Sequence, residues 1–180
     1  MEPEILRVHG AVRAVVAADV ERCDGRPIHL RGVASKFKPH ITLWGRFEPS
    51  SDIDLDRLKD QLIEIAAGIV MPEIDLRGPR PVGDMVWYEA DPDCEGYAAL
   101  RDAHNHLGRR LRAAGLIGAD LLPAAFRGAG YRPHLTAAWG AGVTVASDER
   151  MIRLRVRALS LYTYAHLPSD SFVTSHALRA

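Results

Sequence analysis

Cysteine is scarce in this sequence, and its charge is balanced. Cys23 and Cys94 are the only cysteines among 180 residues, too few for a disulfide framework and without the close spacing of a cysteine metal site. The 23 Lys and Arg residues match the 23 Asp and Glu residues, so no net charge draws the whole chain to nucleic acid or an anionic membrane. Any preference for phosphate must therefore come from a local cluster.

Long hydrophobic runs and a targeting segment are also missing. Nowhere do 18 apolar residues stand together, and residues 1–4 (MEPE) show neither a basic segment nor an apolar run. With so few cysteines, these absences predict a protein of the reducing cytoplasm that does not enter a membrane. The hydrophobic fraction of 47% predicts one domain, residues 1–180, with a sizeable core.

What the sequence does contain is a short phrase that occurs twice. Residues 37–42 (FKPHIT) return as residues 131–136 (YRPHLT). Successive side chains of an extended strand point to opposite faces, so His40 and Thr42 share one face, as do His134 and Thr136. Two such pairs facing one another would surround a small anion with two proton carriers and two hydroxyl donors. That arrangement suits phosphoester chemistry.

Hydrophobic periodicity predicts a mixture of helices and strands. The proline before each histidine cannot donate to a sheet ladder, so both motifs are expected at strand beginnings. A glycine-punctuated loop over residues 115–130 leads into the second motif and is expected to border the site. The predicted strands cover residues 12–20, 28–33, 73–77, 85–90, 152–157 and 172–178. The predicted helices cover residues 55–69 and 97–111, with capping oxygens at residues 50–52, a turn over residues 78–83, and Gly115 ending the second helix.

Two His-x-Thr motifs in one domain resemble the 2H phosphoesterase superfamily, also described as LigT-like or 2′-5′ RNA ligase-like. The resemblance covers the spacing of elements from about Arg31 to the C-terminus. It implies an α+β fold: a two-lobed, pseudo-twofold domain with two antiparallel sheets around a central cleft and helices outside. It also implies that His40 donates a proton to the leaving oxygen and that His134 is the base acting on water. The residues alone leave these two roles interchangeable.

The activity implied by the resemblance is metal-independent hydrolysis of a 2′,3′-cyclic phosphate, on an RNA end or a nucleotide, to a 2′-phosphomonoester. A 2′-5′ RNA ligase-type reaction belongs to the same family. No cofactor or metal is expected, because neither motif has an acidic residue or cysteine within several positions. Thr42 and Thr136 are expected to donate to phosphoryl oxygens. Further substrate contacts are expected from residues that flank the motifs: Lys38, Arg132, Trp44 and Tyr131.

Some alternatives stay open at this point. A nucleotide- or RNA-binding module without significant turnover would share the fold, although two intact proton-transfer groups favour an enzyme. ADP-ribose cyclic phosphate, 2′-5′ linked oligonucleotides and cyclic signalling nucleotides are neighbouring substrates. The protein is expected to act as a monomer. Many bacterial members of the family carry a phosphate-binding Arg three residues after the second Thr, where this chain has Trp139, so the resemblance assigns no cation to the phosphate.

Overall fold

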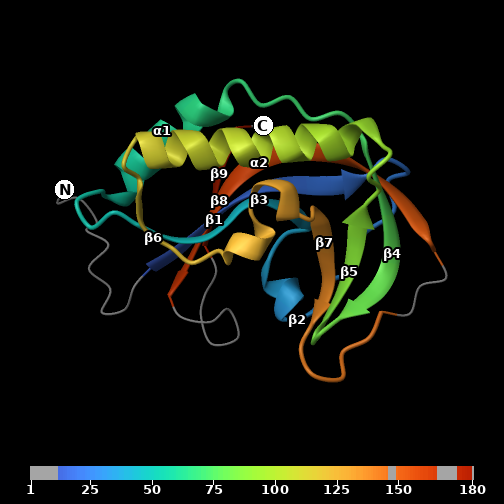
Figure 1. The fold of residues 1–180 in the computed structure, drawn as a ribbon. Coiled ribbons are helices and arrows are strands. Elements are labelled where there is room, and N and C mark those ends of the chain that lie inside the picture. The colour runs from blue at the N-terminus through green and yellow to red at the C-terminus, as the bar shows by residue number, and fades with distance from the viewer. Residues whose placement is uncertain (1–11, 146–148, 166–173, 180) are drawn as a thin grey trace.

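The fold is an α+β arrangement of one large sheet and two helices (Figure 1). The computed structural model describes residues 12–145, 149–165 and 174–179. The strands are β1 (Val12–Arg22), β2 (Arg31–Gly32), β3 (His40–Pro49), β4 (Ile74–Val82), β5 (Met85–Ala90), β6 (Ile117–Asp120), β7 (His134–Trp139), β8 (Met151–Ala165) and β9 (Thr174–Arg179). The helices are α1 (Leu55–Ala66) and α2 (Glu95–Ala113), with short 3-10 turns η1 (Val33–Lys36), η2 (Ala124–Phe126) and η3 (Gly128–Gly130).

The sheet closes on itself through the two motif strands. Its strand order is β2-β7-β5-β4-β8-β1-β3-β6, β9 pairs with β8, and a further bridge joins β3 to β7. That bridge is the antiparallel pair Ile41 and Leu135. The path β7-β5-β4-β8-β1-β3 therefore returns to β7 and forms a barrel-like structure. The described strands thus belong to one sheet instead of the two sheets expected, while the predicted two-lobed pseudo-symmetry stays a prediction.

The two faces of the sheet have different partners. Both helices lie on the same side of the strands (Figure 1), and α2 packs on β3 and β4. On β1 the even-numbered residues Ala14, Val16, Ala18 and Val20 join the large core beneath the helices. The odd-numbered Val15 and Ala17 join a second cluster with Tyr162 and Tyr164 on the other face. Because β1 is buried on both faces, its sequence is almost continuously apolar.

Strand β3 changes the facing of its side chains after the first motif. Thr42 pairs with Ala17 and Trp44 pairs with Val16, so β3 advances two residues while β1 advances one. This is a β-bulge, and a second irregularity follows between Trp44 and Phe47. As a result, both Trp44 and Phe47 are buried in the core beneath the helices.

Behind the two motifs, a buried histidine of α2 connects their strands. The His104 side chain is 1% exposed, its Nδ1 lies 2.8 Å from the carbonyl oxygen of Leu43, and its ring stacks on Tyr131 with centroids 4.1 Å apart. The Tyr131 hydroxyl in turn donates to the carbonyl oxygen of Thr42 at 2.6 Å. The backbone of the first motif is thus held by the residue that begins the second phrase.

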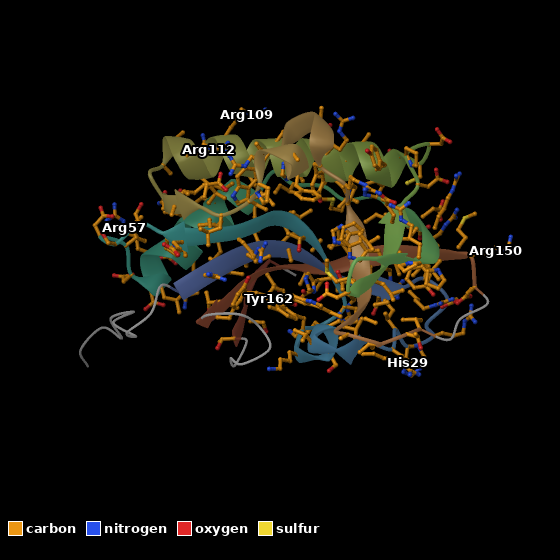
Figure 2. The ribbon with its side chains drawn as sticks, turned by 60° about the horizontal axis from the view of Figure 1, so that its bottom comes forward. His29, Arg57, Arg109, Arg112, Arg150 and Tyr162 are labelled. Atoms are coloured by element: carbon orange, nitrogen blue, oxygen red, sulfur yellow. The ribbon has the colours of Figure 1, made fainter. Side chains whose placement is uncertain are left out.

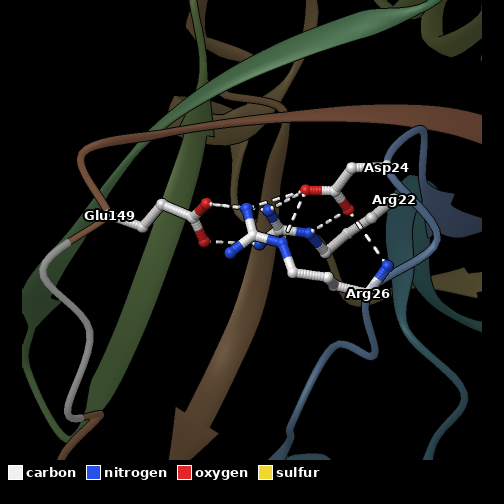
Figure 3. Close-up of polar contacts among 4 residues, drawn as sticks. All are labelled: Arg22, Asp24, Arg26 and Glu149. Atoms are coloured by element: carbon white, nitrogen blue, oxygen red, sulfur yellow. Dashed lines mark hydrogen bonds and ion pairs between the residues drawn. The ribbon is translucent and has the colours of Figure 1, made fainter.

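An ion-pair cluster ties the end of β1 to the residues before β8 (Figure 3). Arg22 contacts Asp24 at 2.5 Å and Glu149 at 2.6 Å, and Arg26 bridges the same two carboxylates. The hydrogen bond from Arg22 lowers the pKa of Glu149 to about 2. The charge of both guanidinium groups is therefore balanced within the cluster.

Several local expectations are corrected. The cap of α1 was expected at residues 50–52, but the helix begins at Leu55 and Asp54 caps it by accepting from the Arg57 N–H at 2.7 Å. The Ser50 hydroxyl instead donates to the carbonyl oxygen of Gly115. Strand β4 runs through residues 78–82, where a turn was expected, because its end pairs with β5. The segment of residues 115–130 contains β6, which pairs with β3, in place of a continuous loop. Within residues 28–33, only Arg31 and Gly32 form a strand, the short β2, and Val33 already begins η1. Residues 172 and 173 of the last expected strand lie outside the described residues.

The contact between α2 and β3 generates a test of the fold. A Cβ atom added to Gly108 would lie 2.4 Å from Cζ3 of the buried Trp44 ring. We expect Gly108→Ala to lower the free energy of unfolding by about 1–3 kcal/mol, although Ala gains about 1 kcal/mol over Gly in a helix interior. Gly68→Ala is the control, since a Cβ there meets no atom within 4 Å. Denaturant unfolding measures both, and equal stability of the two variants would contradict the packing.

Candidate active site

The first residue of each motif strand is a histidine. His40 begins β3 and His134 begins β7. The carbonyl oxygens of the prolines before them accept from neighbouring strands, Pro39 from the Val20 N–H at 2.9 Å and Pro133 from the Ala90 N–H at 2.8 Å. Proline has no N–H to offer a ladder, so it fits only at such a strand beginning. The two copies of the phrase therefore occupy equivalent positions, as the sequence predicts.

The β3–β7 bridge brings the two motifs together on one face. Because Ile41 pairs with Leu135 in an antiparallel ladder, the residues on either side of the bridge lie across from the opposite motif. His40 is then across from Thr136, and Thr42 is across from His134. All four side chains point away from Ile41 and Leu135, which are buried in the core beneath the helices. All four are half-buried.

Both histidine rings are held in the same way. Nδ1 of His40 lies 2.8 Å from the carbonyl oxygen of Lys38, and Nδ1 of His134 lies 2.7 Å from that of Arg132. A carbonyl oxygen only accepts, so Nδ1 of each neutral ring carries the proton and donates it. This tautomer leaves Nε2 of each ring as the position for proton transfer. No described residue hydrogen-bonds to either Nε2.

A buried carboxylate stands next to the first histidine. Asp19 of β1 pairs with His40 in the sheet register and is 6% exposed. Its two oxygens accept from the Ser160 hydroxyl at 2.7 Å and from the Tyr162 hydroxyl at 2.5 Å. The Tyr162 ring also lies beside His40, with centroids 5.1 Å apart. Figure 2 shows Tyr162 on the side of the sheet away from Arg109 and Arg112 of α2.

The second histidine has different neighbours on β5. The Trp87 ring stacks on His134 with centroids 3.7 Å apart and planes inclined by 18°. Glu89 pairs with His134 in the sheet register and accepts from Nε of Arg132 at 2.6 Å. The carboxylate beside this histidine is therefore shared with two cations, since Arg80 also contacts Glu89 at 2.9 Å.

Desolvation lowers the pKa of both histidines, and their neighbours then act in different directions. The pKa of His134 is lowered to about 4, chiefly by burial; the Arg132 carbonyl and the charge of Glu89 act to raise it, and the charges of His40 and Arg132 act to lower it. Burial also lowers the pKa of His40, but the Lys38 carbonyl and the charge of Asp19 both act to raise it. The electrostatic surroundings thus favour the protonated form at His40 more than at His134.

The expected substrate contacts divide between the two faces. Lys38 and Arg132 stand two residues before the histidines, and both side chains are exposed. Trp44 was expected to contact substrate, but the bulge in β3 turns it into the core, where it is 2% exposed. Tyr131 was also expected there, but its ring stacks on the buried His104, and it is 6% exposed. Neither of these two aromatic residues reaches the face that carries the histidines.

Sequence reasoning missed several neighbours of the histidines, including Trp87 and Glu89 beside His134. Asp19 interrupts the apolar run of β1. A carboxylate within such a run is a local sign of a functional or structural polar contact, and it could have been noticed in the sequence. Phe37, whose ring lies 5.2 Å from His40, belongs to the duplicated phrase itself. Tyr162 comes from the distant β8 and has no local signal in the sequence.

Two searches of the described residues gave negative results. No group of three His, Cys, Asp or Glu side chains within them is arranged to hold a metal ion. Neither described helix combines the length and hydropathy that a membrane span needs.

Comparisons with known proteins agree with this geometry. The family model of the 2′-5′ RNA ligase superfamily matches residues 11–166. E. coli LigT complexed with NADP⁺ superposes with a TM-score of 0.52 at 16% identity, covering 95% of this chain and 99% of LigT. E. coli LigT complexed with 3′-AMP gives 0.51 at 17% identity, covering 93% and 98%. Comparison with curated protein sequences gave no match. The family match extends over most of the chain and includes both His-x-Thr motifs, so this protein belongs to the 2′-5′ RNA ligase superfamily, the 2H phosphoesterases.

Proposed function

We propose that this protein is a metal-independent phosphodiesterase that opens a 2′,3′-cyclic phosphate, on an RNA end or a nucleotide, to a 2′-phosphomonoester. The observation that carries the proposal is the β3–β7 bridge, whose register puts a histidine and a threonine from each motif on one face of the sheet. The 3′-AMP complex of LigT supports a nucleotide ligand by analogy of fold. Membership of the superfamily supports phosphoester chemistry in general.

We assign the acid and base roles from the neighbours of each histidine. His134 is the base: its surroundings favour the neutral ring, whose Nε2 lone pair takes a proton from water. His40 is the acid: the Asp19 charge favours the ring that carries a proton on Nε2. These are the roles that the family resemblance implies.

In the proposed step, water forms a new P–O bond as the P–O3′ bond breaks. One proton of the water passes to Nε2 of His134, and the proton on Nε2 of His40 passes to the leaving O3′. Thr42 and Thr136 donate hydrogen bonds to the non-bridging oxygens, where negative charge grows in the transition state. Exchange with solvent then returns the two histidines to their starting protonation states.

Lys38 and Arg132 are proposed to attract the phosphorylated end of the substrate. Each of these residues lies next to a catalytic histidine, because its carbonyl oxygen accepts from Nδ1 of that ring. Arg132 is already paired with Glu89, so Lys38 carries the less compensated charge of the two. A cytoplasmic monomer remains the expectation for the working form.

The proposed chemistry predicts the effect of removing each histidine. We expect His40→Ala and His134→Ala each to lower turnover of a 2′,3′-cyclic nucleotide by about 10²- to 10⁴-fold, the range for a positioned general acid or base. Activity of the wild type should persist with EDTA. His29→Ala is the control, because His29 is exposed and lies outside the site (Figure 2). ³¹P NMR identifies the product as a 2′-phosphate. Loss of activity in EDTA with recovery on adding a divalent ion would assign the chemistry to a metal.

The environment of His40 predicts a shift in the pH profile. Asp19→Asn removes the charge that raises the pKa of His40, so the acid should lose its proton at lower pH. The alkaline limb of kcat/KM, which reports the acid in the free enzyme, should move to lower pH. Ser160→Ala keeps the carboxylate and should move this limb less. A lower rate at every pH with both limbs in place would show that Asp19 only supports the fold.

A further inference from the structure

The site described so far binds one phosphate, but its face continues along β1, β3 and β8. From Asp19 the same face of β1 runs through Ala17 and Val15, which pack with Tyr162 and Tyr164. Phe37 connects this cluster to the first motif, because its ring lies 5.2 Å from His40 and 6.4 Å from Tyr164. A buried aromatic cluster, in which Tyr162 is 1% and Tyr164 is 4% exposed, therefore extends from the catalytic histidine along the sheet.

Arg46 comes to this face because of the bulge in β3. Phe47 pairs with Ala14 and is fully buried in the core beneath the helices, so its exposed neighbour Arg46 lies on the opposite face. The positive charge of Arg46 acts on the hydroxyl of Tyr164 and lowers its pKa, against a larger rise caused by burial. Arg46 thus stands at the far end of the buried aromatic cluster, at most about 13 Å along the strand from Thr42.

The backbone of Arg46 is held in an unfavourable conformation. Its φ is +33°, and among the described residues it is the one residue other than glycine with a positive φ. Such conformations cost energy and persist where the surrounding structure enforces them, often at binding sites. Here the bulge imposes the conformation, and the Arg46 carbonyl oxygen accepts from the Leu121 N–H at 2.9 Å.

Within the described residues, no carboxylate forms an ion pair with Arg46. Arg13, on the same face of β1, pairs with Tyr164 in the sheet register and acts on it in the same direction as Arg46. By contrast, Arg22 and Arg26 are fully engaged by carboxylates (Figure 3). Glu48, the next carboxylate along β3, forms no ion pair with either Arg13 or Arg46 within the described part of the chain. Neither guanidinium group therefore has an ion-pair partner among the described residues.

We infer that Arg46, with Arg13 beside it, binds a second phosphate of the substrate, attached to the 5′ oxygen of the nucleoside whose cyclic phosphate lies between the histidines. Guanidinium groups bind phosphate by charge-assisted hydrogen bonds. This inference rests on the proposed function and narrows its substrates to nucleotides that carry phosphate at both ends.

The test compares substrates that differ only at the 5′ oxygen. All end in a 2′,3′-cyclic phosphate, and the 5′ oxygen carries hydrogen, a monophosphate, a diphosphate or a second nucleotide. In Arg46→Gln we expect KM for the phosphorylated substrates to rise about 10- to 100-fold more than KM for the 5′-hydroxyl substrate. If KM rises most for the 5′-diphosphate substrate, the natural ligand carries a pyrophosphate. If KM rises most for the dinucleotide, the natural ligand is an RNA end. An equal change of KM for all four would overturn the inference.

Two further variants make the result specific. Arg46→Gly also removes the guanidinium but accepts the positive φ, so it should keep a Tm at or above that of the wild type and show the same change in the KM ratio. Arg109→Gln, on the exposed face of α2 (Figure 2), is the control and should leave the ratio as in the wild type.

A binding measurement separates this inference from the proposed reaction. Calorimetry with nucleoside 2′,5′-bisphosphate and 2′-monophosphate needs no turnover. Weaker binding of the bisphosphate alone in Arg46→Gln would support the second phosphate position even if no cyclic phosphate is hydrolysed. Identical affinities of wild type and variant for both ligands would overturn it.

Discussion

The pairing of Ile41 with Leu135 is the contact on which the arrangement of the site depends. This one bridge closes the sheet between β3 and β7, and its two apolar side chains point into the core beneath the helices. Side chains alternate along a strand, so burying these two places a histidine and a threonine from each motif on the opposite face. A register slip of one residue in either strand would turn that motif's polar pair into the core.

The helix side of the sheet keeps the bridge in register. His104 of α2 contacts the Leu43 carbonyl oxygen and stacks on Tyr131, whose hydroxyl binds the Thr42 carbonyl oxygen. Trp44 packs in the same region, close to Gly108. These residues never touch the substrate in our proposal. They restrict the backbone of both motifs, and a catalytic geometry needs this kind of support because small displacements are costly.

Charge around the two histidines is distributed unequally, although the motifs are alike. Asp19, held by Ser160 and Tyr162, lies beside His40, whereas Glu89 beside His134 is shared with Arg80 and Arg132. Two copies of one sequence phrase thus acquire different proton affinities from neighbours contributed by other strands. In the proposed reaction, this inequality lets one copy serve as acid and the other as base.

Sequence patterns were sufficient to place both motifs at strand beginnings. They also placed each histidine on the same face of its strand as the threonine of its motif. They could not place residues beyond the bulge, because an extra residue in β3 leaves no sign in the alternation of residues 43–47 (LWGRF). Trp44 was therefore expected at the site, although the bulge turns it into the core. Tyr131 was misplaced because its partner, His104, comes from a distant helix. Asp19 and Tyr162 meet only because β1 pairs with β8, and a local pattern in the sequence does not show this pairing. Closure into one sheet was missed for the same reason, since it depends on a single bridge between distant strands.

The central claim is that both motifs act on the same phosphate. A crystal structure with a bound nucleoside 2′-monophosphate tests it most directly. We expect one phosphate group within hydrogen-bonding distance of Nε2 of both His40 and His134, with the hydroxyls of Thr42 and Thr136 donating to its oxygens. A phosphate bound to one motif alone, with the other histidine turned away from it, would contradict the account.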